Sequence, residues 1–162
     1  FDYGTSNWDD LVAMSTIRLT GGNFKIEPVA AGGVCSTNLV TNWGEPTKGG
    51  GSPCESYYPI IYSKGHLSVN GVRGQGILLV DGDLAIQGGF QFYGPVIVKG
   101  SLKTTGTGGH INGAVMAANV ELETNTVLGN AVVNYSRCAL LTVLANTSMP
   151  RLANQRAWMD LF

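Results

Sequence analysis

Four acidic residues are the side chains of this sequence whose types and spacing could do chemistry. Asp81 and Asp83 flank one glycine, and Glu121 and Glu123 flank one leucine. Carboxylates about 5 to 9.5 Å apart across a groove can hydrolyse a glycosidic bond, and clustered carboxylates can bind Ca²⁺ when about six to eight oxygen ligands surround it. The repeat described below separates the two pairs by roughly 10 Å, or two layers of chain. We therefore interpret Asp81 and Asp83 as solvated bend residues and predict that the protein is not an enzyme.

Other motifs of catalysis and ligand binding are missing from the sequence. His66 and His110 lie 44 residues apart, and no G-x-S-x-G, H-E-x-x-H or Walker motif occurs. The glycine-rich stretch 71–76 (GVRGQG) lacks the Lys-Ser/Thr pair and the following helix that a phosphate-binding loop needs. We predict no catalytic residue, no metal site and no cofactor.

Aromatic side chains could instead form a strip on which sugar rings stack. The candidates are Tyr57, Tyr58, Tyr62, Phe90, Phe92 and Tyr93. Alternate residues of a strand point to the same side, so Phe90 and Phe92 are expected to point together into the core. The sugar-binding strip stays open as the alternative.

Composition narrows the classes of partner and of fold. Only 13% of the residues are charged, the net charge is −1, and no Lys/Arg cluster occurs. Binding to nucleic acid or to an anionic membrane surface needs such a cluster, so we expect neither. No apolar run reaches the about 18 residues of a membrane span, and we expect no membrane contact by this chain. The 23 glycines, in a chain that is 44% hydrophobic, favour a β fold with many tight bends.

The three cysteines give information on the cellular compartment of the protein. Cys35 and Cys54 flank a Gly/Pro-rich segment that cannot build its own core. A disulfide that closes a loop of roughly this length contributes about 3 kcal/mol, and we predict one between them. Such a bond indicates an oxidising, extracellular compartment. Cys138 lies in an apolar run and is expected to be a buried free thiol.

An internal repeat decides the fold class. The stretch GILLVDGDL from Gly76 returns as GPVIVKGSL from Gly94, 18 residues later. A third copy begins at Gly113, with a one-residue slip in phase after it, and a fainter fourth begins at Gly129. Short Val/Ile/Leu runs between Gly or Asn bends, repeating in one direction, predict strands that pair in parallel with the next copy. We predict an all-β-dominated fold, a short parallel β-solenoid with coils of about 18 residues.

Such coils place equivalent side chains above one another. Leu84 should therefore stack on Leu102, and Val80 on Val98. The residues expected in the solenoid core are Leu67, Val69, Leu78, Val80, Leu84, Ile86, Val96, Val98, Leu102, Val115, Val120, Leu122 and Val132.

The flanks are predicted to cover the ends of a single domain, 1–162. Residues 1–23 form an N-terminal cap with a short helix, which is capped by Ser6 or Asn7, includes LVAMSTI and ends before Gly21-Gly22. Residues 24–64 form a disulfide-clipped loop region. The solenoid coils occupy 65–136, and 137–162 form a C-terminal cap with a buried helix over 137–147 and an apolar tail. The tail side chains Trp158, Met159, Leu161 and Phe162 either pack on the same chain or form a subunit interface.

Several stretches together resemble the C-terminal, surface-exposed regions of bacterial type IV pilus-assembly proteins of the PilX-like minor-pilin group. They are SYYPIIYSKGHLSVNG, GQGILLVDGDLAIQGGFQFYGPVIVKGSLKTTGTGG, NGAVMAANVEL, NAVVNYSRCAL and RAWMDLF. The resemblance spans roughly residues 24 to 162 and implies an extracellular β-solenoid module with a role in pilus assembly, adhesion or cell aggregation. The family carries an apolar N-terminal pilin helix, which this sequence lacks, so we expect that it was removed by processing or truncation if the chain enters a pilus.

The sequence thus predicts an extracellular structural or adhesive module at the cell surface, a minor pilin or filament subunit that acts through protein–protein or surface contact. The expected partners are further copies of the chain or pilus subunits, with a surface glycan as a further candidate. Two alternatives stay open: a bactofilin-like, polymer-forming solenoid, and a carbohydrate-binding or carbohydrate-active β-helix. The predicted disulfide argues against the first alternative.

Overall fold

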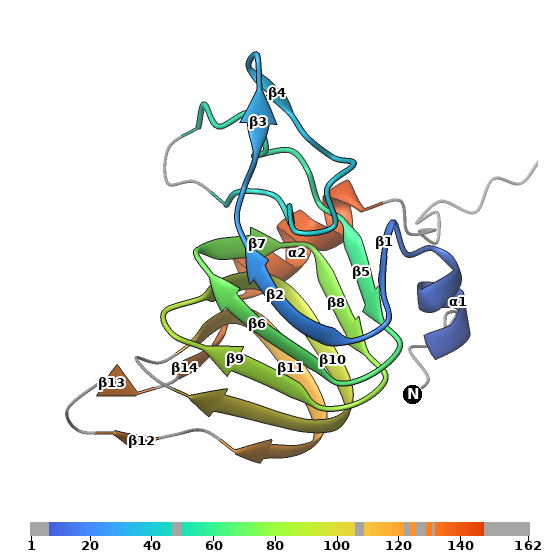
Figure 1. Ribbon diagram of the computed structural model, residues 1–162, viewed down its shortest axis with the longest axis vertical. Coiled ribbons are helices and arrows are strands. Elements are labelled where there is room, and N and C mark those ends of the chain that lie inside the picture. Colours follow the sequence, from blue (N-terminus) through green and yellow to red (C-terminus); the bar gives the residue numbers. More distant parts are fainter. Residues whose placement is uncertain are drawn as a thin grey trace, which may run out of the picture.

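The computed structural model describes residues 7–46, 50–105, 109–121, 124–125, 129–130 and 132–147 (Figure 1). Its helices are α1 (Trp8–Ala13) and α2 (Arg137–Asn146). Its strands are β1 (Ile17–Leu19), β2 (Gly22–Ile26), β3 (Ala30–Ala31), β4 (Val34–Cys35), β5 (Ile60–Ser63), β6 (Leu67–Gly71), β7 (Arg73–Gln75), β8 (Ile77–Val80), β9 (Leu84–Gln87), β10 (Gln91–Thr105), β11 (His110–Glu121), β12 (Thr124–Asn125), β13 (Gly129–Asn130) and β14 (Val132–Tyr135).

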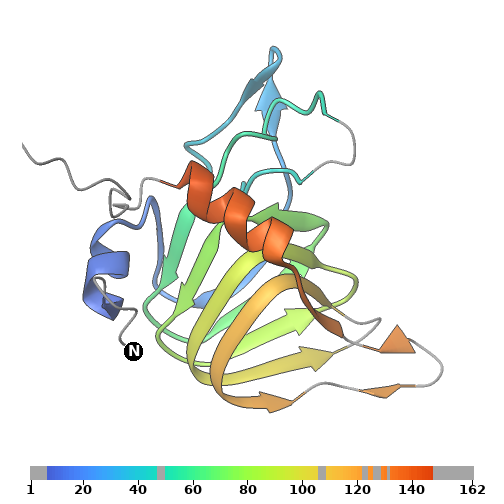
Figure 2. The ribbon, with the colours of Figure 1, turned by 180° about the vertical axis from the view of Figure 1, so that it is seen from behind.

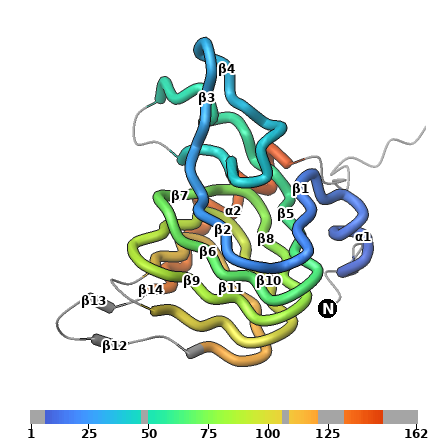
Figure 3. Tube along the Cα trace, in the orientation of Figure 1, coloured from blue at the N-terminus to red at the C-terminus, as the bar shows by residue number. Residues whose placement is uncertain are grey.

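The strands coil into a three-walled parallel β-solenoid, as predicted (Figures 1 and 3). Wall A stacks β1, β5, β8, residues 95–98 of β10 and residues 114–117 of β11. Wall B stacks β2, β6, β9, residues 101–105 of β10 and residues 119–121 of β11. Wall C stacks β7, residues 91–93 of β10, residues 110–113 of β11, and β14. Three turns, from β5 to residue 113, lie between a first turn made of β1 and β2 and a last turn that runs from residue 114 to β14.

The predicted stacking register is confirmed. Val98 pairs with Val80 on wall A, and Leu102 pairs with Leu84 on wall B, each across an offset of 18 residues. The slip in phase after the third copy is a β-bulge, because the register of β10 against β11 shifts between Val98 and Ser101. The sequence period is therefore the length of one coil.

Glycine is required at the corner between walls C and A, where successive coils approach most closely. Gly76 and Gly94 have φ of +115° and +135°, and a Cβ at either would lie 2.1 Å from the carbonyl oxygen of the residue stacked above it, Pro59 and Gly76 respectively. Real Cβ atoms do not tolerate such contacts. The first glycine of each repeat therefore allows both the turn and the layer spacing.

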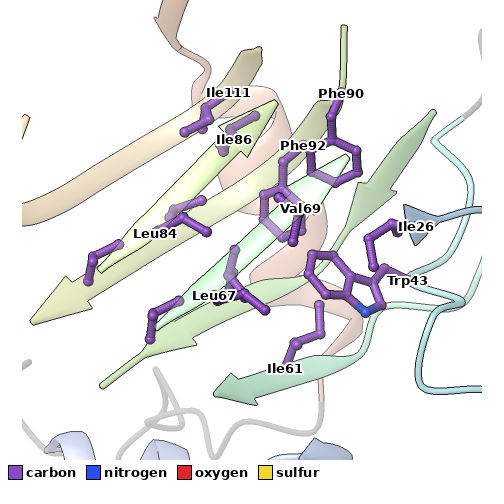
Figure 4. Close-up of a cluster of buried hydrophobic side chains, with 14 of the residues drawn as sticks. Ile26, Trp43, Ile61, Leu67, Val69, Leu84, Ile86, Phe90, Phe92 and Ile111 are labelled. Carbon is purple, nitrogen blue, oxygen red and sulfur yellow. The ribbon is translucent and has the colours of Figure 1, made fainter. Parts of the chain in front are cut away.

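Nine of the thirteen predicted core residues are buried in one cluster inside the three walls (Figure 4). They are Leu67, Val69, Leu78, Val80, Leu84, Ile86, Val96, Val98 and Leu102. Val115 is partly buried and packs against the cluster. Phe90 and Phe92, which were expected to point inward, are fully buried in the same cluster.

The outer side of wall A is also apolar and is covered by both helices. α2 crosses this wall from outside (Figure 2), and Val143 from α2 packs with Ile77, Leu79 and Ile97. α1 adds Trp8 and Leu11 to the same cluster. This second core explains why all four residues of β8 are buried, whereas strands of wall B alternate.

The chain enters the solenoid earlier than the predicted boundary at residue 65. α1 ends at Ala13, and Ile17 belongs to β1 instead of the helix. β1 and β2 form the partial first turn by pairing with β5 and β6. The alternating burial of Ile17, Arg18 and Leu19 fits a strand with one side in the core.

The fourth copy of the repeat is not a copy in register. Val132 pairs with His110, 22 residues earlier, and Gly113 pairs with Tyr135 instead of Gly129. The last turn is longer than the others because the short β12–β13 hairpin is inserted between walls B and C. Val132 shares the register of His110 and Gln91, on the side of wall C opposite to Phe92. Its placement in the core is therefore wrong, and Val133 takes the inward position below Ile111.

Replacing Leu84 by alanine should test the stacked columns. Leu84 is fully buried between Leu67 and Leu102, so Leu84→Ala is expected to lower the free energy of unfolding by about 2–5 kcal/mol. Urea denaturation followed by circular dichroism measures the change. The matched control is Leu141→Ala, at a side chain that is 55% exposed, which should change stability by no more than about 0.5 kcal/mol. Equal losses in the two variants would contradict the column.

Candidate functional site

One end of the solenoid is closed by the loop between β2 and β5. Trp43 of this loop is fully buried and meets Phe90 and Phe92 edge-on, with ring centroids 6.0 and 6.2 Å apart (Figure 4). Its indole N–H donates to the carbonyl of Val40 at 2.9 Å. The backbone N–H of Gln75 donates to the carbonyl of Trp43 at 2.8 Å, so the loop continues wall C by one layer. The core is thereby covered at this end.

The predicted disulfide between Cys35 and Cys54 is confirmed, with Cα atoms 4.8 Å apart. It lies beside Asn42, which is fully buried and whose amide donates to the carbonyls of Val29 and Ser36 at 2.9 and 3.0 Å. The bond therefore joins the two arms of the loop around a buried amide that satisfies their carbonyl groups.

Gln75 fastens the loop to the solenoid from below. Its side chain is buried, and its amide donates to the carbonyls of Glu55 and Tyr57 at 2.8 and 3.0 Å. Neither Gln75 nor the buried Trp43 and Asn42 was found by sequence reasoning. The available signal was a tryptophan and an asparagine side by side in a loop too polar to bury them by itself.

The other end of the solenoid is open across the described residues. β11 is the last strand of walls A and B there: its residues 114–121 pair with β10 on one side and with no described strand on the other. Val120 occupies the predicted column below Leu102, yet its side chain is 45% exposed. The prediction that Val120 is buried is wrong, because no strand of the described residues continues this column below it. Leu122, the next predicted core residue, lies outside the described residues.

A shallow groove of about 670 Å³, lined by both polar and apolar groups, runs along the outer side of wall B. It is lined by Gly22, Asn23, His66, Leu67, Ser68, Asp83, Leu84, Ala85, Ser101 and Lys103. At its rim, Nδ1 of His66 accepts the backbone N–H of Asp83 at 3.0 Å and lies 3.0 Å from the Asp83 carboxylate. The other carboxylate oxygen of Asp83 accepts the backbone N–H of Ser101 at 2.8 Å. Asp83 thus ties two neighbouring coils together at the bend.

The second predicted bend residue, Asp81, belongs to a cluster that holds α1 on wall A. The Lys99 ammonium lies 2.8 Å from the Asp81 carboxylate and 4.5 Å from the centre of the Trp8 ring. The hydroxyl of Tyr62 donates to Asp81 at 3.4 Å, and its ring meets Trp8 edge-on. Burial raises the pKa of Tyr62, and the negative charge of Asp81 adds to the increase. Asp81 and Asp83 therefore both have structural partners.

The remaining tyrosines do not assemble into one strip with Tyr62. Tyr57 and Tyr58 lie in the loop before β5, where burial raises the pKa of each hydroxyl. The Tyr57 hydroxyl donates to the carbonyl of Thr37, and Tyr93 on wall C donates to Gln91. Both phenylalanines lie in the core, and the four tyrosines lie in three places: the loop before β5, wall A and wall C.

Cys138 is a free thiol, as expected, but it is exposed and not buried. It lies in the first turn of α2, and only Val143 of that helix is buried. The apolar run that contains Cys138 therefore faces wall A with one narrow stripe. The predicted interface residues Trp158, Met159, Leu161 and Phe162, like Glu123, lie outside the described residues.

The described residues include neither a metal-binding cluster nor a membrane-spanning helix. They contain no group of three or more His, Cys, Asp or Glu side chains placed to hold a metal ion. In the same part of the chain, neither helix is long and apolar enough to cross a membrane.

Comparison of the chain with models of protein families, with curated proteins and with solved structures finds no match.

Removing the disulfide should loosen the closed end. The double variant Cys35→Ala/Cys54→Ala is expected to lower the free energy of unfolding by about 2–4 kcal/mol, because the unfolded chain regains the freedom of the closed loop. Urea denaturation without reductant measures it. The control is Cys138→Ala at the exposed free thiol, which should leave the midpoint unchanged. A double variant as stable as the control would contradict the structural role of the bond.

Proposed function

We propose that this protein is an extracellular structural or adhesive module, associated with type IV pili, that works through contact with other proteins or surfaces. The observation that carries the proposal is the asymmetry of the solenoid. A disulfide-clipped loop covers one end of the core, and an apolar strand edge is presented at the other.

The disulfide supports the proposed extracellular location. The Cys35–Cys54 bond lies beside the fully buried Asn42 amide and closes the loop that carries Trp43. Stable bonds of this kind belong to oxidising compartments and are rare in the cytosol. A protein whose core is closed by a loop with such a bond is suited to the cell surface.

The surface chemistry supports contact as the mode of action. The carboxylates that could have acted as acid and base, Asp81 and Asp83, instead bind Lys99, Tyr62 and the backbone N–H of Ser101. These interactions hold coils and α1 in place. The association with pili, as a minor pilin or filament subunit, rests on the resemblance of residues 24–162 to the PilX-like group.

A bactofilin-like polymer is supported less well. Growth of a filament by stacking solenoids requires two ends that can each accept a neighbour. The end that carries Trp43 is closed by its own loop, which leaves a single end for stacking.

Binding of a surface glycan is a second candidate function, because polar side chains line part of the groove on wall B and can bind sugar hydroxyls. Lys103 and Ser101 supply donors there, and Asp83 supplies an acceptor. A glycan array probed with the wild-type chain and with Lys103→Ala would measure it. Binding lost in that variant but kept in Lys25→Ala would support the groove. Lys25 is a suitable control because it lies on β2 and is not among the groove residues.

Surface labelling tests the principal proposal. Antibodies against the purified, disulfide-intact chain are expected to label intact cells that produce the protein and filaments sheared from them. Mass spectrometry without reductant should find Cys35 and Cys54 linked in the material from cells. Labelling that requires permeabilised cells, together with reduced cysteines, would contradict the proposal.

A further inference from the structure

The geometry points to a closed, head-to-head dimer in which the open end of one solenoid stacks on the open end of a second copy. The inference rests on the proposed contact function and adds its partner, its surface and its stoichiometry. The surface is the edge formed by residues 114–117 on wall A, residues 119–121 on wall B, and β14 on wall C.

This edge offers hydrogen-bonding groups that the described chain leaves for a partner strand. Every second N–H and C=O of an edge strand points away from its one neighbour. In β11 the side-chain oxygen of Asn119 accepts the Val120 N–H at 3.0 Å, and residues 114–117 show no such local cover among the hydrogen bonds of the described residues. Wall A therefore presents the barest part of the edge.

The inner side chains of the last turn are apolar and incompletely covered. Val120 is 45% exposed below Leu102, whereas Leu102 itself is fully buried. Val115 and Ala117 lie below Val96 and Val98, which are also fully buried, but are themselves only partly buried. One further layer of apolar side chains would complete the three columns.

The charge of the edge suits pairing with itself. Residues 114–121 (AVMAANVE) contain a single ionisable side chain, Glu121, at the end of the strand. Natural edge strands are usually guarded against self-pairing by lysine, proline or an inward-pointing charge. Residues 114–117 have none of these, so two copies of wall A can meet without repulsion between like charges.

Two-fold symmetry fixes how the copies meet. A two-fold axis through wall A reverses the direction of the coil, so residues 114–117 pair antiparallel with the same residues of the second copy. Wall B of each copy then lies on wall C of the other. Inward side chains must meet inward side chains, which centres the pairing on either Val115 or Met116. With Trp43 and its loop covering both outer ends, the assembly stops at two chains.

The first test uses charge at the centre of the contact. The full, disulfide-intact chain is expected to have twice the mass of the 17.1 kDa monomer in light scattering after size-exclusion chromatography. Val115→Asp and Val115→Lys should each weaken the dimer by at least about tenfold in Kd, because like charges meet near the axis. Mixing the two variants should restore a mixed dimer. Val72→Asp and Val72→Lys, at a bend 44% exposed and remote from the edge, are the matched controls and should dimerise as the wild type does.

The second test introduces no charge. In a Cys138→Ser background, Met116→Cys or Val115→Cys should form an intermolecular disulfide on mild oxidation, because facing residues of antiparallel strands lie about 4.5–5.5 Å apart. The variant that cross-links faster identifies the centre of the pairing. Val72→Cys in the same background should stay monomeric on a non-reducing gel.

Several outcomes would overturn the dimer. They are a monomer at about 0.1 mM, polymers longer than two chains, or failure of both cysteine variants to cross-link. A chain that dimerises only after residues 148–162 are deleted would assign the edge to its own C-terminal segment. A monomer that still labels the cell surface overturns the dimer alone, whereas a dimer confined to permeabilised cells contradicts the proposed function alone.

Discussion

The close approach of successive coils at the corner between walls C and A is the constraint on which the rest of the structure depends. A Cβ at Gly76 or Gly94 would lie 2.1 Å from a carbonyl oxygen of the coil above. Because only glycine permits this approach at the positive φ of the corner, the walls can keep the spacing of paired parallel strands. That spacing brings Leu84 onto Leu102 and Val80 onto Val98, so the columns of the core follow from the corner. The repeat in the sequence thus follows from the need for glycine where the backbones of successive coils approach each other.

The repeated layers do not by themselves determine where the solenoid stops. The features that are specific to this protein therefore lie at its two ends. At one end the repeat is replaced by a loop, residues 27–59, which buries Trp43 against Phe90 and Phe92. That loop has too little apolar surface to hold itself, and the disulfide together with the amides of Asn42 and Gln75 supplies the missing constraint. At the other end β11 keeps the inward valines of the repeat although no described layer follows. The two ends therefore differ: the first is closed by a cross-linked loop, and the second leaves the apolar core partly exposed.

Sequence reasoning succeeded where the repeat operates and failed where it stops. Leu84 and Val98 could be placed because each recurs at the coil period with a glycine before it. Trp43 could not, because a loop without period gives no register for its side chains. Val120 was assigned to the right column and the wrong environment, since burial depends on the layer below, which the period alone does not count. Val132 was misplaced because the β12–β13 insertion lengthens the last turn, and a shift by one residue turns a side chain to the other side of its strand.

The distribution of apolar surface favours the open end as the place of the proposed contact. Wall A has apolar side chains on both sides, and most of its outer side is covered by α1 and α2, with Lys99 over Trp8 holding the first helix; Met116, on the last strand of this wall, is 47% exposed. Wall B turns polar side chains outward, and its bends are occupied by interactions between coils, such as that of Asp83 with Ser101. Evolving a contact on either wall would require new side chains to replace existing structural ones. The open end needs none, because a second layer that continues the columns satisfies the backbone edge and the exposed Val120 together. The same stacking that builds the monomer is thus the simplest interaction by which the monomer can bind a partner.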